Sequence, residues 1–372
     1  MTVGVASTPC QGTFGKTNRR IPMQEVECAQ KVMEGIAGSK LLSFVAPLLE
    51  NRDGITEVVK VSDHFQVEKY ANKSLDGFLN LHRVNDIQGI NRFFRLANQK
   101  LKSGGGFVGC VETLEQRRER LFRKFPAVIN VGYYASDFIF KRVFPKFKFT
   151  KKIYFLLTGG RNRALSKSEI LGRLVYCGFQ IEETEEIDGK LYFKVRKVSE
   201  PLAEAEPSTG LLLRIKRIGF HNQLITVYKF RTMHPYAQYI QAYVFEQNAL
   251  QNGGKFADDF RITKWGRWMR KFWIDEIPMI YNILRGDLKL VGVRPLSEHY
   301  LSLYSNEHKV LRVKGKPGLI PPFYADMPNT LDEIMESESR YIKAYFQDPI
   351  STDFNVCLKA FSNILLKKAR SN

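Results

Sequence analysis

Residues 270–295 read RKFWIDEIPMIYNILRGDLKLVGVRP, and this stretch carries the most informative chemistry of the chain. It sets two adjacent carboxylates, Asp275 and Glu276, between Arg270 on one side and Arg294 on the other. An isolated Asp-Glu pair means little, but carboxylates among cations are typical of sites that hold phosphate groups. The cations bind phosphate oxygens, and a carboxylate can act as a nucleophile toward phosphorus.

A helix is predicted to begin at the two carboxylates. Asp275 stands at the N-cap position, Glu276 falls in the first turn, and Pro278 follows closely. The free amides and the dipole of a helix N-terminus stabilise carboxylates and phosphates alike. The residues by themselves therefore fit two interpretations, a well-capped helix or a catalytic pair kept ionised at a phosphate site.

The residues just before the carboxylates predict an amphipathic helix over 262–272. Its apolar stripe is either core or membrane-facing and consists of Trp265, Trp268, Met269 and Phe272. Arg267 and Arg270 lie largely off this stripe, where they are either solvated or clamp a substrate.

Two predicted strands supply further cations. A strand over residues 224–232 would direct Lys229 and Arg231 to one face, because side chains alternate along a strand. Arg294 follows the apolar strand 288–293 and suits bidentate binding of phosphate.

The stretch from about residue 210 to 366 resembles the bacterial sugar transferases, the monotopic phosphoglycosyl transferases. These enzymes move a sugar phosphate from a nucleotide sugar to a polyprenyl phosphate. Four segments match in order: YKFRTM at 228–233, DDFRITKWG at 258–266 with the following Arg270 and Lys271, DEIP at 275–278, and LVGVRPL at 290–296.

The resemblance implies a two-step reaction through an Asp275 phosphosugar intermediate, with Mg²⁺ bound by Glu276. The implied site comprises the catalytic pair Asp275 and Glu276, the phosphate-binding cations Lys229, Arg231, Arg267, Arg270 and Arg294, and less defined roles for Asp258, Asp259, Arg261 and Asp353. The implied substrates are a nucleoside diphosphate sugar and a polyprenyl phosphate. The implied products serve exopolysaccharide, capsule or lipopolysaccharide synthesis beside partner glycosyltransferases.

The sequence also departs from the family pattern. The family carries a long apolar re-entrant helix before the Lys-Phe-Arg strand, whereas residues 200–210 here form an acidic, proline-rich linker. The turn reads Gly-Val-Arg-Pro where a proline usually precedes the arginine, and KPGLIPP at 316–322 replaces the usual Arg-Pro-Gly-Ile-Thr-Gly.

The N-terminal half predicts alternating strands and helices. Strands are expected at 55–61, 76–81 and 107–111, helices at 87–101 and 166–176, a turn at Gly104–Gly106, and a hairpin of 179–184 with 190–197 around Asp188-Gly189. Ser166 and Glu169 form a capping box. This order resembles the back half of a class I methyltransferase, but no glycine-rich cofactor loop follows a strand.

The expected fold class is α/β, with a degenerate Rossmann-like N-terminal domain followed by a compact α+β catalytic domain. The expected divisions are a poorly defined region 1–54, a Rossmann-like domain 55–199, a linker 200–210 and the catalytic domain 211–372. Residues 125–158, rich in aromatic and basic side chains, form either a helical insertion packed on the scaffold or a membrane-docking element. Residues 354–368 predict an amphipathic helix that either lies on an anionic bilayer or packs on the core.

Composition narrows the functional classes. The 372 residues carry a net charge of +19, which favours nucleic acid, anionic lipid or phosphorylated substrates. No recognised nucleic-acid module is present, so a nucleic-acid partner is not expected. The five cysteines show no Cys-x-x-Cys spacing and favour reduced thiols.

No signal peptide and no transmembrane span are expected, because no run of 18 apolar residues occurs. The predicted location is the cytoplasmic face of the bacterial inner membrane, by peripheral or monotopic attachment. The sequence thus predicts a phosphoglycosyl transferase. The alternative is a non-catalytic scaffold of the same pathway that binds lipid phosphate or a partner.

Overall fold

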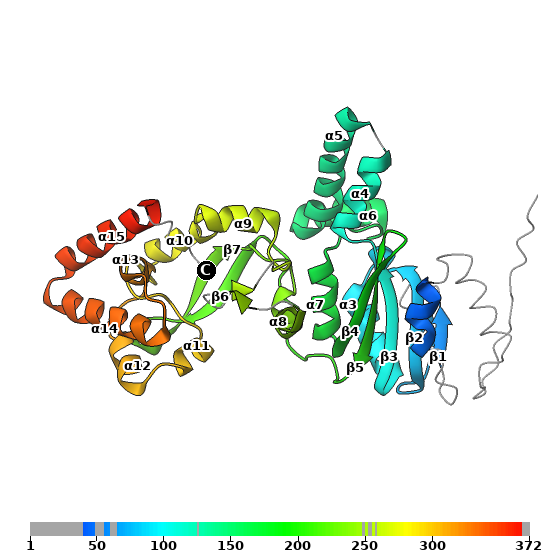
Figure 1. Ribbon diagram of the computed structural model, residues 1–372, viewed down its shortest axis with the longest axis horizontal. Coiled ribbons are helices and arrows are strands. Elements are labelled where there is room, and N and C mark those ends of the chain that lie inside the picture. Colours follow the sequence, from blue (N-terminus) through cyan, green and yellow to red (C-terminus); the bar gives the residue numbers. More distant parts are fainter. Residues whose placement is uncertain are drawn as a thin grey trace, which may run out of the picture.

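The chain folds into a mixed α/β structure (Figure 1). The computed structural model describes residues 40–48, 56–59, 65–124, 126–247, 250–251, 255–256 and 259–366. Predictions for residues 1–39 and for Asp258 therefore fall outside the described residues.

The N-terminal half is built on a five-stranded mixed sheet in the order β1-β2-β3-β5-β4. Its strands are β1 (Thr56–Val59), β2 (Leu75–Arg83), β3 (Leu101–Val111), β4 (Phe179–Ile187) and β5 (Lys190–Lys197). The first three strands are parallel, and β5 runs antiparallel to both β3 and β4. This sheet confirms the predicted strands and the hairpin at Asp188-Gly189, where both residues have positive φ.

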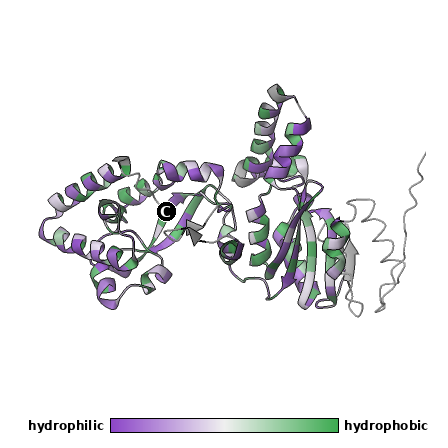
Figure 2. Cartoon of the chain, in the orientation of Figure 1, coloured by the Kyte–Doolittle hydropathy of each residue, from purple (hydrophilic) through white to green (hydrophobic). Residues whose placement is uncertain are grey.

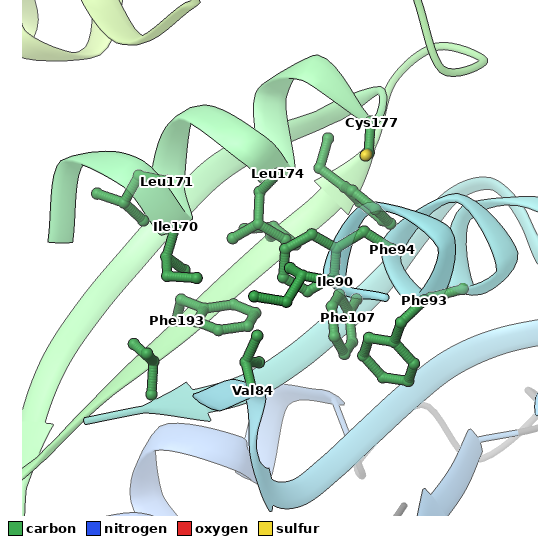
Figure 3. Packing of buried hydrophobic residues seen from close by; sticks show 14 of the residues in the cluster. Val84, Ile90, Phe93, Phe94, Phe107, Ile170, Leu171, Leu174, Cys177 and Phe193 are labelled. Carbon is green, nitrogen blue, oxygen red and sulfur yellow. The ribbon is translucent and has the colours of Figure 1, made fainter. Parts of the chain in front are cut away.

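Helices cover both faces of this sheet. On one face lie the helices α3 (Ile90–Lys100) and α7 (Lys167–Tyr176), preceded by the short α2 (Phe65–Glu68). A helix over residues 40–48 covers the other face through Leu41, Phe44 and Val45. The core between α3, α7 and the sheet is rich in phenylalanine, and Phe107 contacts Phe94 and Phe193 with ring centroids 6.0 and 5.5 Å apart (Figure 3).

One prediction in this half was wrong. Gly104–Gly106 do not form a turn, because β3 begins at Leu101 directly after α3 and runs through them. Leu75 pairs with Leu101 and Gly77 pairs with Gly106, so β3 carries its extra residues in a bulge. Gly104 takes φ of 78° there, a conformation that glycine adopts without steric cost. The N-cap half of the predicted capping box is confirmed, since the Ser166 side chain accepts a hydrogen bond from the Glu169 amide, while the Glu169 carboxylate accepts from Arg142 and Arg173.

The basic, aromatic segment forms a helical insertion that projects from the sheet (Figure 1). It contains α5 (Ala127–Phe138), the π-helical turn η2 (Ile139–Val143), the 3₁₀ turn η3 (Phe144–Lys146) and α6 (Lys148–Thr158), and α4 (Leu114–Lys124) leads into it from β3. Buried Arg117 anchors the insertion by donating to Asp137 at 2.6 and 2.8 Å.

The C-terminal half consists of short sheets and helices. Its strands are β6 (Leu212–Ile218), β7 (Leu224–Phe230), β8 (Leu250–Gln251), β9 (Lys255–Phe256), β10 (Lys289–Val291) and β11 (Gly318–Ile320), and a 3₁₀ turn η4 (Phe220–Asn222) joins β6 to β7. β6 and β7 form an antiparallel hairpin, whereas β10 and β11 are parallel.

The helices of this half surround the short sheets (Figure 1). They are α9 (Lys264–Lys271), the 3₁₀ turn η6 (Ile274–Glu276), α10 (Met279–Leu284), α11 (Glu298–Ser302), α12 (Asn306–Arg312), α13 (Phe323–Asp326), α14 (Leu331–Gln347) and α15 (Pro349–Leu366). Within the described residues, none of the helices is both long enough and apolar enough to span a bilayer.

A segment after β7 ties the two halves together. The 3₁₀ turn η5 (Ala237–Ile240) and helix α8 (Gln241–Gln247) bury Ile240 and Val244 in the core of the N-terminal sheet. Tyr236 takes φ of 63°, and its hydroxyl accepts a hydrogen bond from Asn91 at 2.6 Å. A Cβ on Gly172 would lie 2.2 Å from the Tyr236 carbonyl oxygen, so only glycine permits this approach.

Candidate functional site

A pocket of about 510 Å³, open to solvent, lies where the β6–β7 hairpin meets β10, β11 and α10. Its polar lining consists of three cations and one carboxylate, namely Arg217, Lys229, Arg294 and Glu276. The apolar lining includes Met279, Leu319 and Pro321, and Tyr324 lies beside them. A cavity with several converging cations suits a ligand that carries phosphate groups.

Strand alternation places two of the cations in the pocket. Ile215 and Arg217 on β6, and Val227 and Lys229 on β7, line it together because alternate residues share a face. Sequence reasoning found Lys229 but missed Arg217. The signal that could have revealed it is a break in the alternation, because Arg217 is a basic residue in the register of the apolar Leu213 and Ile215.

Glycines place the third cation. β10 and β11 approach so closely that a Cβ on Gly318 would lie 2.2 Å from the Gly292 amide nitrogen. This contact fixes the turn that carries Arg294, and the backbone carbonyl of Arg294 accepts a hydrogen bond from buried Arg312. Arg294 and Arg217 repel one another, and burial together with this repulsion lowers the pKa of Arg217. A phosphate dianion between them would relieve that repulsion.

Glu276 faces this pocket and is already paired. Its Oε1 accepts from Lys229 Nζ at 2.6 Å, and Glu276 is only 6 % exposed. The buried Asn282 fixes the same strand, because it donates to the Thr226 carbonyl at 2.7 Å and accepts from the Tyr228 amide at 3.1 Å. Helix α10, which follows Asp275 and Glu276 in the chain, is therefore held against β7 by Asn282.

Asp275 is in a different local structure from the predicted one. It lies inside the 3₁₀ turn η6, and α10 begins only after Pro278, so Asp275 does not act as a helix N-cap. Trp273, with φ of 58°, ends the preceding helix and turns the chain into η6. The sequence pattern could not distinguish this tight turn from a first helical turn, because both place an acidic residue near free amides.

The Asp275 carboxylate is buried and incompletely satisfied. The residue is 7 % exposed, and its Oδ1 has no hydrogen-bond partner in the described structure. Burial raises the pKa of Asp275, with a smaller contribution from the charge of Glu276, while Lys229 and Arg270 oppose the shift. A poorly solvated carboxylate beside cations has the properties of an activated nucleophile.

Arg270 connects this carboxylate with the end of β7. Its Nε donates to Thr232 Oγ1 at 3.0 Å, and its charge acts on Asp275. Helix α9 approaches Thr232 closely, since a Cβ on Gly266 would lie 1.9 Å from the Thr232 carbonyl oxygen. Burial lowers the pKa of Arg270, and the nearby carboxylate of Asp275 counteracts that effect.

Asp275 and Arg270 are not among the residues that line the pocket, and the structure does not bring the other predicted residues into it either. The Arg231 guanidinium donates to the linker carbonyls of Gly210, at 2.8 Å, and Ser208. Arg267 is exposed on α9. Asp259 forms an ion pair with Arg261 at 2.7 Å, and this pair gives both side chains a structural role.

Asp353 also lies in a structural cluster away from the pocket. It accepts from Lys289 at 3.0 Å and from the Tyr341 hydroxyl at 2.6 Å. These contacts join α14 and α15 to β10. Asp353 therefore holds the outer helices in place.

The predicted apolar stripe on α9 is not core, because Trp265, Trp268 and Phe272 are 67, 47 and 55 % exposed. Helix α15 packs on the core through Ala360 and Ile364, as the core interpretation expects. It also has outward apolar side chains, as do residues near α10; these are Phe354, Leu358 and Phe361 on α15 and Ile277, Ile280 and Leu284 near α10. We call the surface formed by these residues the apolar platform.

Comparison with known proteins agrees with this site. Residues 201–367 match the model of the family described as bacterial sugar transferase. The chain is 33 % identical over 154 residues to the galactosyl transferase CpsE of Streptococcus agalactiae, covering 40 % of this chain and 33 % of that protein. It is 31 % identical over 122 residues to the undecaprenyl-phosphate galactose phosphotransferase of Salmonella typhimurium, covering 32 % and 25 %.

A SAM-dependent methyltransferase from Thermotoga maritima aligns with a TM-score of 0.22 and 15 % identity, over 35 % of this chain and 58 % of that one. The chain spans about a third of the length of CpsE. The segment that matches the bacterial sugar transferase model, residues 201–367, contains the β6–β7 hairpin, Asp275 and Glu276, and the cationic pocket.

Proposed function

We propose that the protein is a phosphoglycosyl transferase that moves a sugar phosphate from a nucleoside diphosphate sugar to a polyprenyl phosphate. The observation that carries this proposal is the pocket lined by Arg217, Lys229, Arg294 and Glu276, with the buried Asp275 carboxylate directly before Glu276 in the chain. Relatives named as undecaprenyl-phosphate sugar phosphotransferases support the same substrate classes.

The proposed reaction has two displacements at phosphorus. Asp275 attacks the sugar-bearing phosphorus, a bond from its carboxylate oxygen to phosphorus forms, and the bond to the departing nucleoside monophosphate breaks. A phosphate oxygen of the polyprenyl phosphate then attacks the same phosphorus and releases the Asp275 carboxylate. The pocket cations offset negative charge on the transferring group in both steps, which is where most catalysis of phosphoryl transfer arises.

Mg²⁺ is the proposed cofactor. The two adjacent carboxylates offer the hard oxygen ligands that this ion prefers, and it needs only one or two of them beside substrate phosphates and water. Glu276 would hold the ion after releasing Lys229 to a substrate phosphate, and Asp275 would be left as the nucleophile. When bound, Mg²⁺ would neutralise the diphosphate.

The acceptor places the reaction at a membrane. The apolar platform on α9, α10 and α15 suits contact with the acyl boundary of a bilayer, where the polyprenyl chain is held. We place the protein on the cytoplasmic face of the bacterial inner membrane, among glycosyltransferases that build exopolysaccharide, capsule or lipopolysaccharide. Within this proposal, residues 55–199 are a Rossmann-like scaffold without methyl transfer, and residues 211–372 are the catalytic domain.

The test is release of nucleoside monophosphate from a panel of nucleotide sugars, with Mg²⁺ and polyprenyl phosphate in detergent. We expect release with at least one donor by the native chain and none by Asp275→Asn. Phosphosugar trapped on the native protein, when acceptor is omitted, would identify the intermediate. Absence of release with every donor, by folded protein, would favour a non-catalytic scaffold that binds lipid phosphate or a partner.

A further inference from the structure

The helical insertion between β3 and α7 exposes large apolar side chains outside the sugar transferase domain. On α5 and η2 these are Ile129, Val131, Tyr133 and Ile139, and around α6 they are Phe147, Ile153, Leu156 and Leu157. Leu156 and Leu157 are 85 and 67 % exposed. Isolated exposed apolar residues are ordinary, but several of them on one projecting element indicate a contact surface.

The apolar residues of α6 form a stripe with a defined orientation. Ile153, Leu156 and Leu157 follow the spacing of one helix face. Tyr154, on the other side, is fully buried, and its hydroxyl donates to the Arg161 carbonyl at 2.6 Å. The exposed stripe is therefore held outward by a packed inner face.

Cations surround this surface with little opposing charge. Residues 125–158 contain five lysines and one arginine but a single acidic residue, Asp137. That aspartate is already bound by Arg117 in two hydrogen bonds. Lys151 and Lys152 are exposed on α6, where Lys152 borders the stripe and Lys151 lies near the Phe155 ring, and Figure 2 shows hydrophilic and hydrophobic residues interleaved on these helices.

We propose that this insertion, centred on α5 and α6, docks the N-terminal half onto the surface of an anionic lipid bilayer. The apolar stripe would enter the acyl boundary while the lysines reach lipid phosphates, as amphipathic elements with long basic side chains do. Lys141 already extends along apolar surface in this way, with its ammonium 5.1 Å from the centre of the Phe140 ring.

Other occupants fit less well. A second copy of the same surface would bring two cationic patches together in a symmetric contact. A nucleic acid would bind the lysines but would leave the aliphatic Leu156 and Leu157 in water. An anionic bilayer satisfies both features at once.

This surface lies outside the sugar transferase domain, and its test needs no turnover. Binding of the full chain to vesicles is measured by co-sedimentation, with phosphatidylcholine alone and with added phosphatidylglycerol. The variants are the pairs Leu156→Asp with Leu157→Asp and Lys151→Glu with Lys152→Glu, all at exposed positions. Val198→Asp is the control, because Val198 is 53 % exposed after β5 and outside the insertion.

We expect tighter binding to the anionic vesicles, and a loss on the order of tenfold in both paired variants but not in the control. At high salt the variant with both lysines replaced should bind vesicles as tightly as the native chain, since exposed charges are then screened. Unchanged vesicle binding by both pairs would overturn the proposal, as would equal affinity for neutral and anionic vesicles. Loss of self-association or of RNA binding in these variants, with vesicle binding intact, would assign the surface to another partner and overturn it.

Discussion

The two adjacent carboxylates of the dyad should respond to amide substitution with opposite changes in stability. Asp275 has a buried oxygen without a hydrogen-bond partner, so its negative charge opposes folding. Asn has the same shape and no charge. We expect Asp275→Asn to raise the free energy of unfolding at neutral pH by about 1–2 kcal/mol, the scale of an unsatisfied buried polar group.

Glu276→Gln should act in the other direction. It leaves Lys229 beside a neutral amide and removes a 2.6 Å ion pair in which the carboxylate side chain is 7 % exposed. Removing one partner of a fully buried pair costs about 3–5 kcal/mol. The Lys229 side chain is 21 % exposed and regains some hydration, so we expect a smaller loss of about 1–3 kcal/mol.

The pH dependence distinguishes this explanation from a packing effect. Because the pKa of Asp275 is raised in the folded protein, its contribution to stability is greatest below the unfolded pKa and is lost as pH rises through the folded pKa. The advantage of Asp275→Asn should therefore be largest at neutral pH and should shrink as the pH falls into the range where native Asp275 is protonated.

Tryptophan fluorescence during urea unfolding is the assay. All three tryptophans, Trp265, Trp268 and Trp273, lie in the segment that leads into the dyad, so the signal reports this domain alone. A decrease in stability for Asp275→Asn, or an increase that does not depend on pH, would refute the account of an unpartnered, ionised carboxylate.

Three further predictions test the placement of residues. Arg294→Ala should raise KM for the nucleotide sugar about tenfold to hundredfold, the value of one charged hydrogen bond, whereas Arg231→Ala should leave that KM unchanged because its guanidinium binds the linker. Gly172→Ala should destabilise the fold by about 1–3 kcal/mol in thermal unfolding, because the added Cβ meets the Tyr236 carbonyl. Asp353→Asn should lower stability by about 1 kcal/mol with kcat unchanged, and a loss of turnover without unfolding would contradict its structural assignment.

Local features of this protein followed from the sequence. The helix N-cap at Ser166 and the Asp188-Gly189 hairpin were predicted correctly, because hydrogen bonds between neighbouring residues and the conformational preference of glycine decide them. The order of motifs around Asp275 likewise indicated the family. In these cases the necessary partners lie within a few residues of one another in the chain.

Only the tertiary structure decided which of the many cations serve the pocket. The pairing of β6 with β7 places Arg217 and Lys229 in the pocket, and the close contact of β10 with β11 places Arg294 there. Arg231 follows the last residue of β7, and its guanidinium donates a hydrogen bond to the linker carbonyl of Gly210 instead. The sequence names charged residues, but burial and long-range contacts determine which of those charges face one another, because electrostatic energies depend on distance and solvent exposure.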